Sequence, residues 1–313
     1  MARLAINRET VSSSYNRIRS RIRRTPTLQI APRDIACEFG ELHLKLELLQ
    51  HAGSFKTRGA FTHFVVGETP EAGVVAASGG NHGAAVAFAA REMGAKASIF
   101  VPEIADPAKT QRISELGAEL HVGGALYADA LKAAEAFAAE TGAKQIHAFD
   151  QPETLIGQGS VGLELEQQAP GLNTVLVAVG GGGLIGGIAA WYQGRVKIVS
   201  VEPKTAAALK AAMDAGAPTD VDVSGIAADS LGASRVGRLA FPLCQSFVEE
   251  TVLVTDDDIK AAQAVLWQST RLVAEPGGAA ALAALISGAY KPGPDERVGV
   301  IICGANTRTL PGV

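Results

Sequence analysis

From Gly73 onward, short apolar segments alternate with helical patterns, and this alternation constrains the fold more than any other feature of the sequence. Strands are expected at Val74–Ala77, Ala97–Val101, Glu119–Val122 and Gln145–Phe149, and helices at Asn81–Gly94, Pro107–Leu116 and Tyr127–Thr141. Strands separated by helices at this spacing form parallel βαβ units. This part of the chain therefore predicts a compact α/β unit of its own.

A second series of the same kind follows Asp150. Its expected strands are Thr174–Val179, Lys197–Val201, Glu250–Val254 and Val298–Cys303, and its helices are Thr154–Gln168, Leu184–Tyr192, Asp256–Gln268 and Gly277–Gly288. Residues 214–235 are rich in Gly, Asp and Ser and predict a long loop. Before Gly73 we expect a polar helix at residues 8–23, ended by Arg24-Thr25-Pro26, and an extended segment at Leu42–Leu49.

The two series predict an α/β fold of two open, twisted, mainly parallel sheets flanked by helices. We expect the N-terminal segment to fold against the second series. Residues 1–62 and 150–313 then form a large domain, and residues 63–149 form a small one.

Composition narrows the class of protein. The 313 residues are 47% hydrophobic with a formal charge of -4, and charge is not gathered in blocks of one sign, which argues against a nucleic-acid surface. The three cysteines are widely spaced and predict neither a disulfide framework nor a zinc site. No signal peptide and no apolar run of membrane-spanning length is seen, so we expect a cytoplasmic protein without membrane or nucleic-acid partners.

The decapeptide His51–Ala60, HAGSFKTRGA, contains the first candidate for chemistry. Lys56 lies beside Phe55 and two residues before Arg58, and both an apolar neighbour and a nearby cation favour the neutral amine that Schiff-base chemistry needs. A lysine of this kind, taken alone, is most often a solvated surface residue. Whether Lys56 is a Schiff-base lysine or a surface residue depends on the other motifs of the chain.

A glycine run, VGGGGLIGG, follows the expected strand Thr174–Val179 and contains G-x-G-x-x-G at Gly181, Gly183 and Gly186. Such glycines let backbone amides approach a phosphate at a helix N-terminus. Glu202 ends the next strand about 20 residues later, as in a dinucleotide-binding fingerprint, so a nicotinamide-linked dehydrogenase is a rival interpretation. Close packing of helix on strand is a third explanation of the glycines.

The turn Ser78-Gly79-Gly80-Asn81-His82-Gly83 lies between a strand and a helix. Its backbone amides and the Ser78 hydroxyl can hold a carboxylate, and the Asn81 amide can donate to a phenolate oxygen. The plain alternative is a turn in which Ser78 caps the helix. A dehydrogenase leaves this turn and Lys56 unused, whereas a pyridoxal phosphate enzyme uses both.

Cys303 closes an apolar strand, and on its own it reads as a buried core cysteine. A protonated thiol would leave a pyridine nitrogen neutral, whereas an aspartate would hold it protonated. A neutral ring is the weaker electron sink and suits elimination of a β-leaving group. Glu275 can cap the helix that follows it, and this structural role is at least as well supported as a catalytic one.

The chain resembles the fold-type II pyridoxal phosphate enzymes, in particular the serine/threonine dehydratase and serine racemase group. The motifs that carry the resemblance occur in family order over nearly the whole chain: Arg24-Thr25-Pro26, Lys45-Leu46-Glu47 through SFKTRGA, SGGNHG, Gly157-Gln158-Gly159-Ser160, VGGGGLIGG, Val201-Glu202-Pro203, Glu275-Pro276 and CGAN. Together these motifs are highly specific.

The resemblance implies pyridoxal 5'-phosphate as the cofactor, bound in the large domain through a Schiff base with Lys56. Phe55 would pack on the ring, Asn81 would bond the ring hydroxyl, Cys303 would face the ring nitrogen, and Glu275 would lie beside the cofactor. The phosphate would be held by the backbone amides of Gly180, Gly181, Gly182, Gly183 and Leu184. The substrate carboxylate would be held by Ser78, Gly79, Gly80, Asn81 and His82.

The implied reaction removes water from an L-3-hydroxy amino acid, L-threonine or L-serine, and yields a 2-oxo acid and ammonia. A homodimer is also implied. Similar racemases carry a second serine where this chain has Gly79, so we expect little racemisation. Some relatives bind a divalent cation through Glu202, the carbonyl of Ala206 and a carboxylate where this chain has Ala208, so we expect no metal there. The sequence continues only a few residues beyond CGANT, and a regulatory tail is not expected.

Four interpretations stay open. A β-eliminating dehydratase is favoured over a racemase or a β-replacement synthase on the same scaffold. The others are a dinucleotide-dependent oxidoreductase and a noncatalytic pyridoxal phosphate carrier. The β-substituent of the substrate is not set by these motifs.

Overall fold

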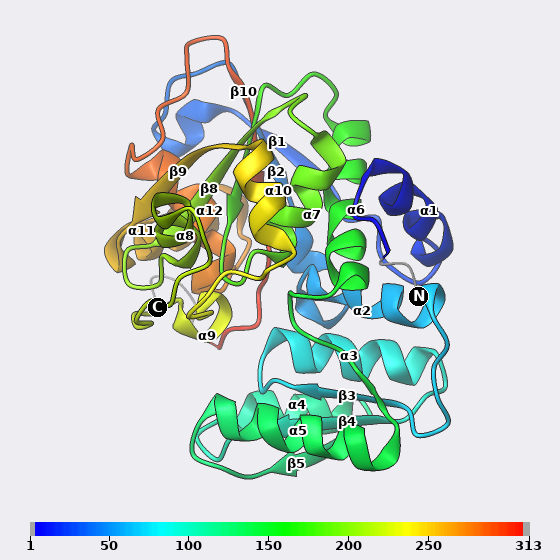
Figure 1. Ribbon diagram of the computed structural model, residues 1–313. Coiled ribbons are helices and arrows are strands. Elements are labelled where there is room, and N and C mark those ends of the chain that lie inside the picture. Colours follow the sequence, from blue (N-terminus) through cyan, green and yellow to red (C-terminus); the bar gives the residue numbers. More distant parts are fainter. Residues whose placement is uncertain (1–3, 309–313) are drawn as a thin grey trace.

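Two β-sheets organise the chain, and the computed structural model describes residues 4–308 (Figure 1). The larger sheet has the strand order β1-β2-β10-β7-β8-β9. Its strands are β1 (Thr27–Ile30), β2 (Glu41–Lys45), β7 (Thr174–Ala178), β8 (Lys197–Pro203), β9 (Val248–Val254) and β10 (Arg297–Ile301). β1 pairs antiparallel with β2, and the other pairings are parallel. We call the part of the molecule built around this sheet the large lobe.

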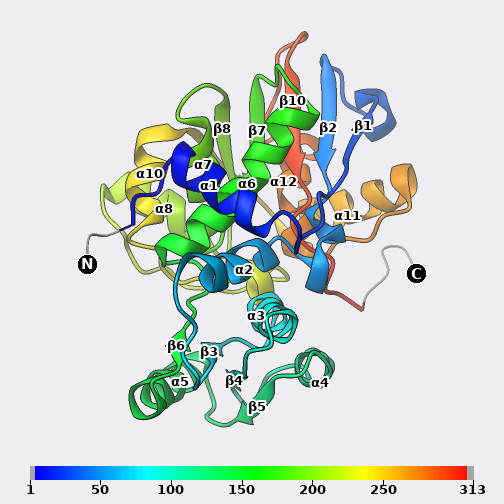
Figure 2. The same cartoon turned by 90° about the vertical axis from the view of Figure 1, so that its right-hand side faces the viewer.

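The smaller sheet is parallel throughout, with the order β5-β4-β3-β6. Its strands are β3 (Val74–Ala77), β4 (Ala97–Val101), β5 (Glu119–Val122) and β6 (Lys144–Gln145). Helices α3 (Asn81–Glu92) and α4 (Pro107–Glu115) lie on one face and α5 (Tyr127–Thr141) on the other (Figure 2). This part is the small lobe. The predicted fold class, two mainly parallel sheets flanked by helices, is confirmed.

The helices of the large lobe cover both faces of its sheet (Figure 2). On one side lie α1 (Arg8–Ile18), α2 (Lys56–Val66), α6 (Pro152–Gln168), α7 (Gly183–Tyr192) and α10 (Ala240–Phe247), and on the other lie α11 (Asp256–Thr270) and α12 (Pro276–Ile286). Two further helices, α8 (Ala208–Ala215) and α9 (Ala228–Leu231), lie in the connection between β8 and α10. Short 3-10 turns occupy Pro32–Ile35, Glu47–Leu49 and His51–Gly53.

Glycine lets α6 and α7 pack closely. A Cβ added to Gly187 would lie 2.3 Å from the carbonyl oxygen of Leu155 and 2.6 Å from the amide nitrogen of Gly159. Because both contacts are with backbone, no side chain could move aside to make room. The two glycines therefore set the separation of α6 from the helix that begins at the glycine run.

The strand order explains where a site can form. β2, β10 and β7 are parallel neighbours, with Leu44 opposite Val300 and Val300 opposite Leu176. Their carboxyl ends therefore share one edge of the sheet, which is where open α/β sheets bind ligands. From this edge the chain continues to Lys56, to Cys303 and to the glycine run.

Several expected elements differ from the structure. The strand expected at Gln145–Phe149 ends at Gln145, because the amides of Phe149 and Asp150 donate to Nδ1 of His147 at 3.3 and 3.0 Å and so leave the sheet. The helix expected at residues 8–23 ends at Ile18. The loop expected at 214–235 contains the short helix α9. The elements β1, α2, α8 and α10 were not expected from the sequence.

Within residues 4–308, no helix is both long enough and apolar enough to cross a lipid bilayer.

Candidate active site

The amine of Lys56 lies in a cavity at the carboxyl edge of the large sheet. Lys56 is the first residue of α2, and its Nζ donates to the carbonyl of Ala148 at 2.8 Å. Burial lowers its pKa from the ordinary value to about 8, and the neighbouring Cys303 and Glu275 oppose only part of that shift. A substantial fraction of this amine is therefore neutral and nucleophilic near pH 8.

A network of charged groups behind the cavity holds the start of α2. Arg58 donates to both carboxylate oxygens of Glu47 at 2.8 and 2.7 Å and to Glu164 on α6 at 3.0 and 2.8 Å. Lys45 donates to Glu164 at 2.7 Å, and all four side chains are fully buried. Burial alone would lower the pKa of Arg58, but the two carboxylates raise it. The network joins β2, α2 and α6 next to Lys56.

The glycine run forms a tight turn into α7. Gly182 has a φ of 87°, a left-handed conformation that favours glycine. A Cβ on Gly181 would lie 2.3 Å from the Phe149 ring, and one on Gly180 would lie 3.0 Å from Leu231. The turn precedes the ten-residue helix α7, whose first N–H groups have no acceptor within the helix. Such a helix start is suited to a phosphate.

Three polar side chains complete the cavity. The Asn81 Nδ2 donates to Oε1 of Glu275 at 2.5 Å, and the Cys303 thiol donates to the carbonyl of Gly277 at 3.4 Å. Burial raises the pKa of Cys303, so its thiol stays protonated at neutral pH. Burial also raises the pKa of Glu275 to about 7, against the lowering effect of the Asn81 hydrogen bond. Glu275 occupies the N-cap position of α12, but its carboxylate accepts no helix amide.

All ten residues expected to bind the cofactor line this cavity: Phe55, Lys56, Asn81, Gly180, Gly181, Gly182, Gly183, Leu184, Glu275 and Cys303. Phe149, Ser230 and Leu231 also line it and were not predicted from the sequence as cofactor-binding residues. Phe149 belongs to the segment predicted as strand, and Ser230 and Leu231 to the segment predicted as loop. Because the secondary structure of both segments was predicted incorrectly, the position of these residues in the cavity was not predicted either.

The expected substrate turn lies at the start of α3, and its residues have different surroundings. Ser78 Oγ accepts from the Gly80 amide at 3.2 Å. The His82 ring contacts the carbonyl of Ile146 at 2.9 Å, and burial, with help from Lys56, lowers its pKa to about 3. Ser78, Gly79 and His82 line neither this cavity nor the larger one beside it, whereas Gly80 lines the larger one. The His82 side chain therefore supports the small lobe.

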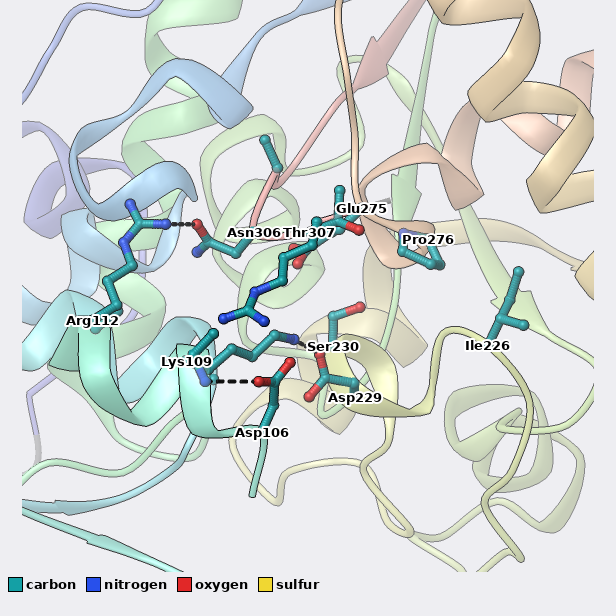
Figure 3. A pocket seen from close by; sticks show the side chains of 15 residues that line it. Asp106, Lys109, Arg112, Ile226, Asp229, Ser230, Glu275, Pro276, Asn306 and Thr307 are labelled. Carbon is teal, nitrogen blue, oxygen red and sulfur yellow. Dashed lines mark hydrogen bonds and ion pairs between the residues drawn. The ribbon is translucent and has the colours of Figure 1, made fainter. Parts of the chain in front are cut away.

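The larger cavity opens between the lobes next to the Lys56 cavity (Figure 3). Two contacts across it join α4 of the small lobe to the large lobe: Lys109 forms an ion pair with Asp229, and Arg112 donates to Asn306 at 2.5 Å. Ser230 and Glu275 line both cavities, so the two cavities adjoin.

Glu202, the first of the expected cation ligands in related enzymes, has a different role in this chain. Its carboxylate oxygens accept from the amides of Leu209 and Lys210 at 2.7 and 2.8 Å and so cap α8. Burial raises its pKa to about 7. Among the residues that the structure describes, no cluster of three His, Cys, Asp or Glu is arranged to hold a metal ion.

A buried amine of lowered pKa, a phosphate-binding turn and a protonated thiol in one cavity define a site for an aldehyde cofactor that carries a phosphate. The model of the family described as pyridoxal-phosphate dependent enzyme matches residues 18–304, and the chain belongs to that family. The residues present fit this cofactor: the turn into α7 has room for backbone amides but not for side chains, and Lys56 is poised as a neutral amine.

Individual relatives carry more specific names. The chain is 39% identical over 247 residues to the biosynthetic L-threonine dehydratase of Haemophilus influenzae, covering 77% of this chain and 48% of that protein. It is 35% identical over 272 residues to the L-threonine ammonia-lyase of Thermotoga maritima, covering 85% and 67%. It thus spans about half to two thirds of these relatives. The maize serine racemase structure superposes with a TM-score of 0.91 at 31% identity, covering 97% of this chain and 94% of that one.

Proposed function

We propose that the protein is a pyridoxal phosphate-dependent lyase that removes water from an L-3-hydroxy amino acid, L-threonine or L-serine, to give a 2-oxo acid and ammonia. The observation that carries the proposal is the Lys56 amine, with a pKa lowered to about 8, in one cavity with a glycine turn and a protonated thiol. The two relatives named threonine dehydratase and threonine ammonia-lyase support the substrate class.

In this proposal each group has one task. Lys56 holds the cofactor and, once displaced by substrate, takes the proton from the substrate Cα as a neutral amine. The main-chain amides of Gly180–Gly183 and Leu184 bind the cofactor phosphate, and Phe55 and Asn81 contact the ring and its hydroxyl. Bound pyridoxal phosphate supplies the electron sink for the substrate carbanion. Cys303 keeps the ring nitrogen uncharged, because a protonated thiol carries no negative charge that would hold a proton there.

The substrate carboxylate is assigned to the turn that opens α3. Asn81 is the first residue of that helix, so the first N–H groups of α3 lack acceptors within the helix and can bind an anion. Gly80 faces the larger cavity, through which substrate reaches Lys56. Ser78 and His82 contribute to carboxylate binding by maintaining the conformation of the turn. Gly79 adds no side chain that would crowd it.

Racemisation is a second candidate, because the maize serine racemase has a closely similar fold. Gly79 argues against it, since glycine has no side-chain proton to give to the opposite face of the substrate. A Cβ at this position would lie 3.1 Å from the Cβ of Ala105, so a longer side chain would also crowd the connection before α4. We expect D-serine formation from L-serine to be far slower than release of keto acid, and comparable rates would favour the racemase.

We further propose that residues 1–62 and 150–313 form one domain and residues 63–149 the other, and that the protein acts as a cytoplasmic homodimer. The division follows the two sheets. The three free cysteines, Cys37, Cys244 and Cys303, suit a reducing compartment. The homodimer rests on the family resemblance, and sedimentation equilibrium of the purified chain checks it.

Keto acid release tests the proposed function. The purified protein, loaded with pyridoxal phosphate and given no added thiol, is offered L-serine, L-threonine, 3-hydroxyaspartate and a bulkier 3-hydroxy amino acid. We expect 2-oxo acid and ammonia in equal amounts from at least one of the first two substrates. Lys56→Ala should lower the rate by about a thousandfold or more, since it removes the proton-transfer group. An undiminished rate in Lys56→Ala, or turnover only when a thiol is added, contradicts the proposal.

A further inference from the structure

We propose that Asn306 is a positioning residue that fixes the orientation of the Asn81 side-chain amide, and that Arg112 of the small lobe in turn fixes Asn306. The inference rests on the proposed function, in which Asn81 donates to the cofactor ring hydroxyl. It adds two residues that do not touch the cofactor but decide which atom of Asn81 faces it.

The contacts form a continuous chain from the surface to the cavity. Arg112 Nη1 donates to Asn306 Oδ1 at 2.5 Å (Figure 3). Asn306 Nδ2 donates to the carbonyl of Ala52 at 2.8 Å and to Asn81 Oδ1 at 2.5 Å. Asn81 Nδ2 then donates to Oε1 of Glu275 at 2.5 Å. The contacts of Asn306 with Arg112 and Asn81, and that of Asn81 with Glu275, join the two lobes, whereas the contact with Ala52 lies within the large lobe.

The chemistry of the outer groups makes the orientation unambiguous. A guanidinium can only donate, so the Asn306 atom that faces Arg112 must be its oxygen. A main-chain carbonyl can only accept, so the atom that faces Ala52 must be the Asn306 nitrogen. That nitrogen also faces Asn81, which must therefore present its oxygen. The Asn81 nitrogen is left to face Glu275 and the cavity.

Glu275 cannot fix the Asn81 amide by itself. Burial raises its pKa to about 7, so near neutral pH a large fraction of this carboxyl is protonated. A protonated carboxyl can donate as well as accept and so tolerates either orientation of a neighbouring amide. The donor supplied by Asn306 is the group that excludes the reversed orientation. One hydrogen of Asn81 Nδ2 bonds Glu275, and the second is free to point into the cavity.

Asn306 is itself anchored firmly to the large lobe. The amide of Ala305 donates to the carbonyl of Gly53 at 3.0 Å, and Gly304 forms an antiparallel bridge with Ser54. A Cβ on Gly53 would lie 2.4 Å from Asn306 Oδ1, so glycine there makes room for the amide. Gly53 and Ser54 belong to the segment that leads through Phe55 to Lys56. Asn306 thus serves as a fixed point against which Asn81, from the small lobe, is aligned.

The test compares cofactor binding in wild type, Asn306→Asp and Arg112→Ala, with Gln111→Ala as the matched control. Aspartate is nearly isosteric and keeps an acceptor for Arg112, but it loses both donors. Arg112→Ala removes an exposed side chain and leaves those donors in place. Gln111 lies on the same helix as Arg112, and its side chain donates to Glu115 on that helix at 2.8 Å. Pyridoxal phosphate affinity, the absorption spectrum of the bound cofactor and the melting temperature are measured without substrate.

We expect Asn306→Asp to weaken cofactor affinity about ten- to a hundredfold, as when a hydrogen bond to a charged group is lost. The absorption maximum should shift, while the melting temperature of the cofactor-free protein stays within about 3 °C. Arg112→Ala should show the same spectral shift with a smaller loss of affinity, and Gln111→Ala should match wild type. Wild-type affinity and spectrum in both Asn306→Asp and Arg112→Ala would overturn the inference.

If Asn306→Asp does not fold, the Arg112→Ala variant still tests the inference, because its cofactor spectrum and cofactor affinity can be compared with those of wild type. Because no substrate is present, the result does not depend on whether wild type releases keto acid. A wild-type protein that bound no pyridoxal phosphate would overturn this inference and the proposed function together. Cofactor binding without keto acid release would count against the lyase alone.

Discussion

Burial makes Lys56 a different reagent from a solvated lysine. A solvated lysine has a pKa near 10.4 and is almost wholly protonated at neutral pH. Removal of Lys56 from water lowers its pKa to about 8, while the Ala148 carbonyl orients the amine. The protein therefore supplies a nucleophile without needing a separate base to deprotonate it.

The rate at which the cofactor-free protein takes up pyridoxal phosphate should follow this pKa. Only the neutral amine attacks an aldehyde, so the rate should rise with pH through about 8 and level off above about pH 9. Absorbance of the bound cofactor, followed in a stopped-flow instrument between pH 6.5 and 10.5, measures it. A rate that kept rising beyond pH 10 would show an ordinary lysine. Lys56→Ala serves as the blank.

Much of the site could be predicted at the scale of single residues. Lys56, the glycine run, Asn81 and Cys303 belong to short motifs whose chemistry is specific, and the structure brings them into one cavity. Their roles toward a cofactor stay predictions. Phe149 and Asn306 could not be assigned in this way, because their contacts depend on how a loop and a chain end return to the sheet. The surroundings of His82 were also hidden, since nothing in SGGNHG says which way its ring turns.

The elements around Lys56 are joined by buried charge rather than by apolar packing alone. Arg58, Glu47, Lys45 and Glu164 carry two positive and two negative charges and exclude water. Because the four groups neutralise and hydrogen-bond one another, the set is tolerated in the interior. Removal of one partner leaves another charge buried without its counterpart, and that is strongly destabilising.

Two matched substitutions on α6 test this reasoning. Glu164→Gln removes a fully buried charge and should lower the free energy of unfolding by about 3 kcal/mol or more. Glu166→Gln changes a partly exposed carboxylate that pairs with Arg8 and Arg195, and should cost at most about 1 kcal/mol. Urea unfolding of the two variants measures the difference. Equal losses of unfolding free energy in the two variants would show that burial of the network does not determine how much it stabilises the protein.

Several strands and helices of the small lobe were predicted with their observed bounds, whereas some helices of the large lobe were missed. β4, β5 and α5 have the expected bounds. Helix α2, in contrast, contacts α1, α3 and α6, so most of its residues are buried and its sequence lacks a polar stripe. Helix α10 contains Pro242 in its first turn, a position that tolerates proline, but no capping side chain marks where this short helix begins.

At the scale of the whole molecule, the site depends on two lobes built around separate sheets. Alternation of strands and helices predicts the sheets, but periodicity cannot say that the last strand, β10, inserts between β2 and β7. That insertion places Cys303 between the lysine segment and the glycine run. The small lobe adds Asn81, and the contacts of Lys109 and Arg112 across the larger cavity hold it there.

A cofactor that binds between these elements should stabilise the whole chain. At a free concentration about 100 times its Kd, a ligand adds about 2.7 kcal/mol, which corresponds to a rise in Tm of about 5 °C for a chain of this size. Scanning calorimetry with pyridoxal phosphate and with pyridoxal at equal concentration measures it. We expect a smaller shift with pyridoxal, because it leaves the glycine turn unengaged. Equal shifts would mean that the turn binds no phosphate.

The central claim is that Lys56 carries pyridoxal phosphate, and borohydride reduction followed by peptide mass spectrometry tests it most directly. Reduction fixes the cofactor to whichever amine holds it. We predict loss of the yellow colour and near-stoichiometric modification of Lys56. Modification of a different lysine with Lys56 left free, or a nucleotide recovered from the glycine turn instead, would contradict the account.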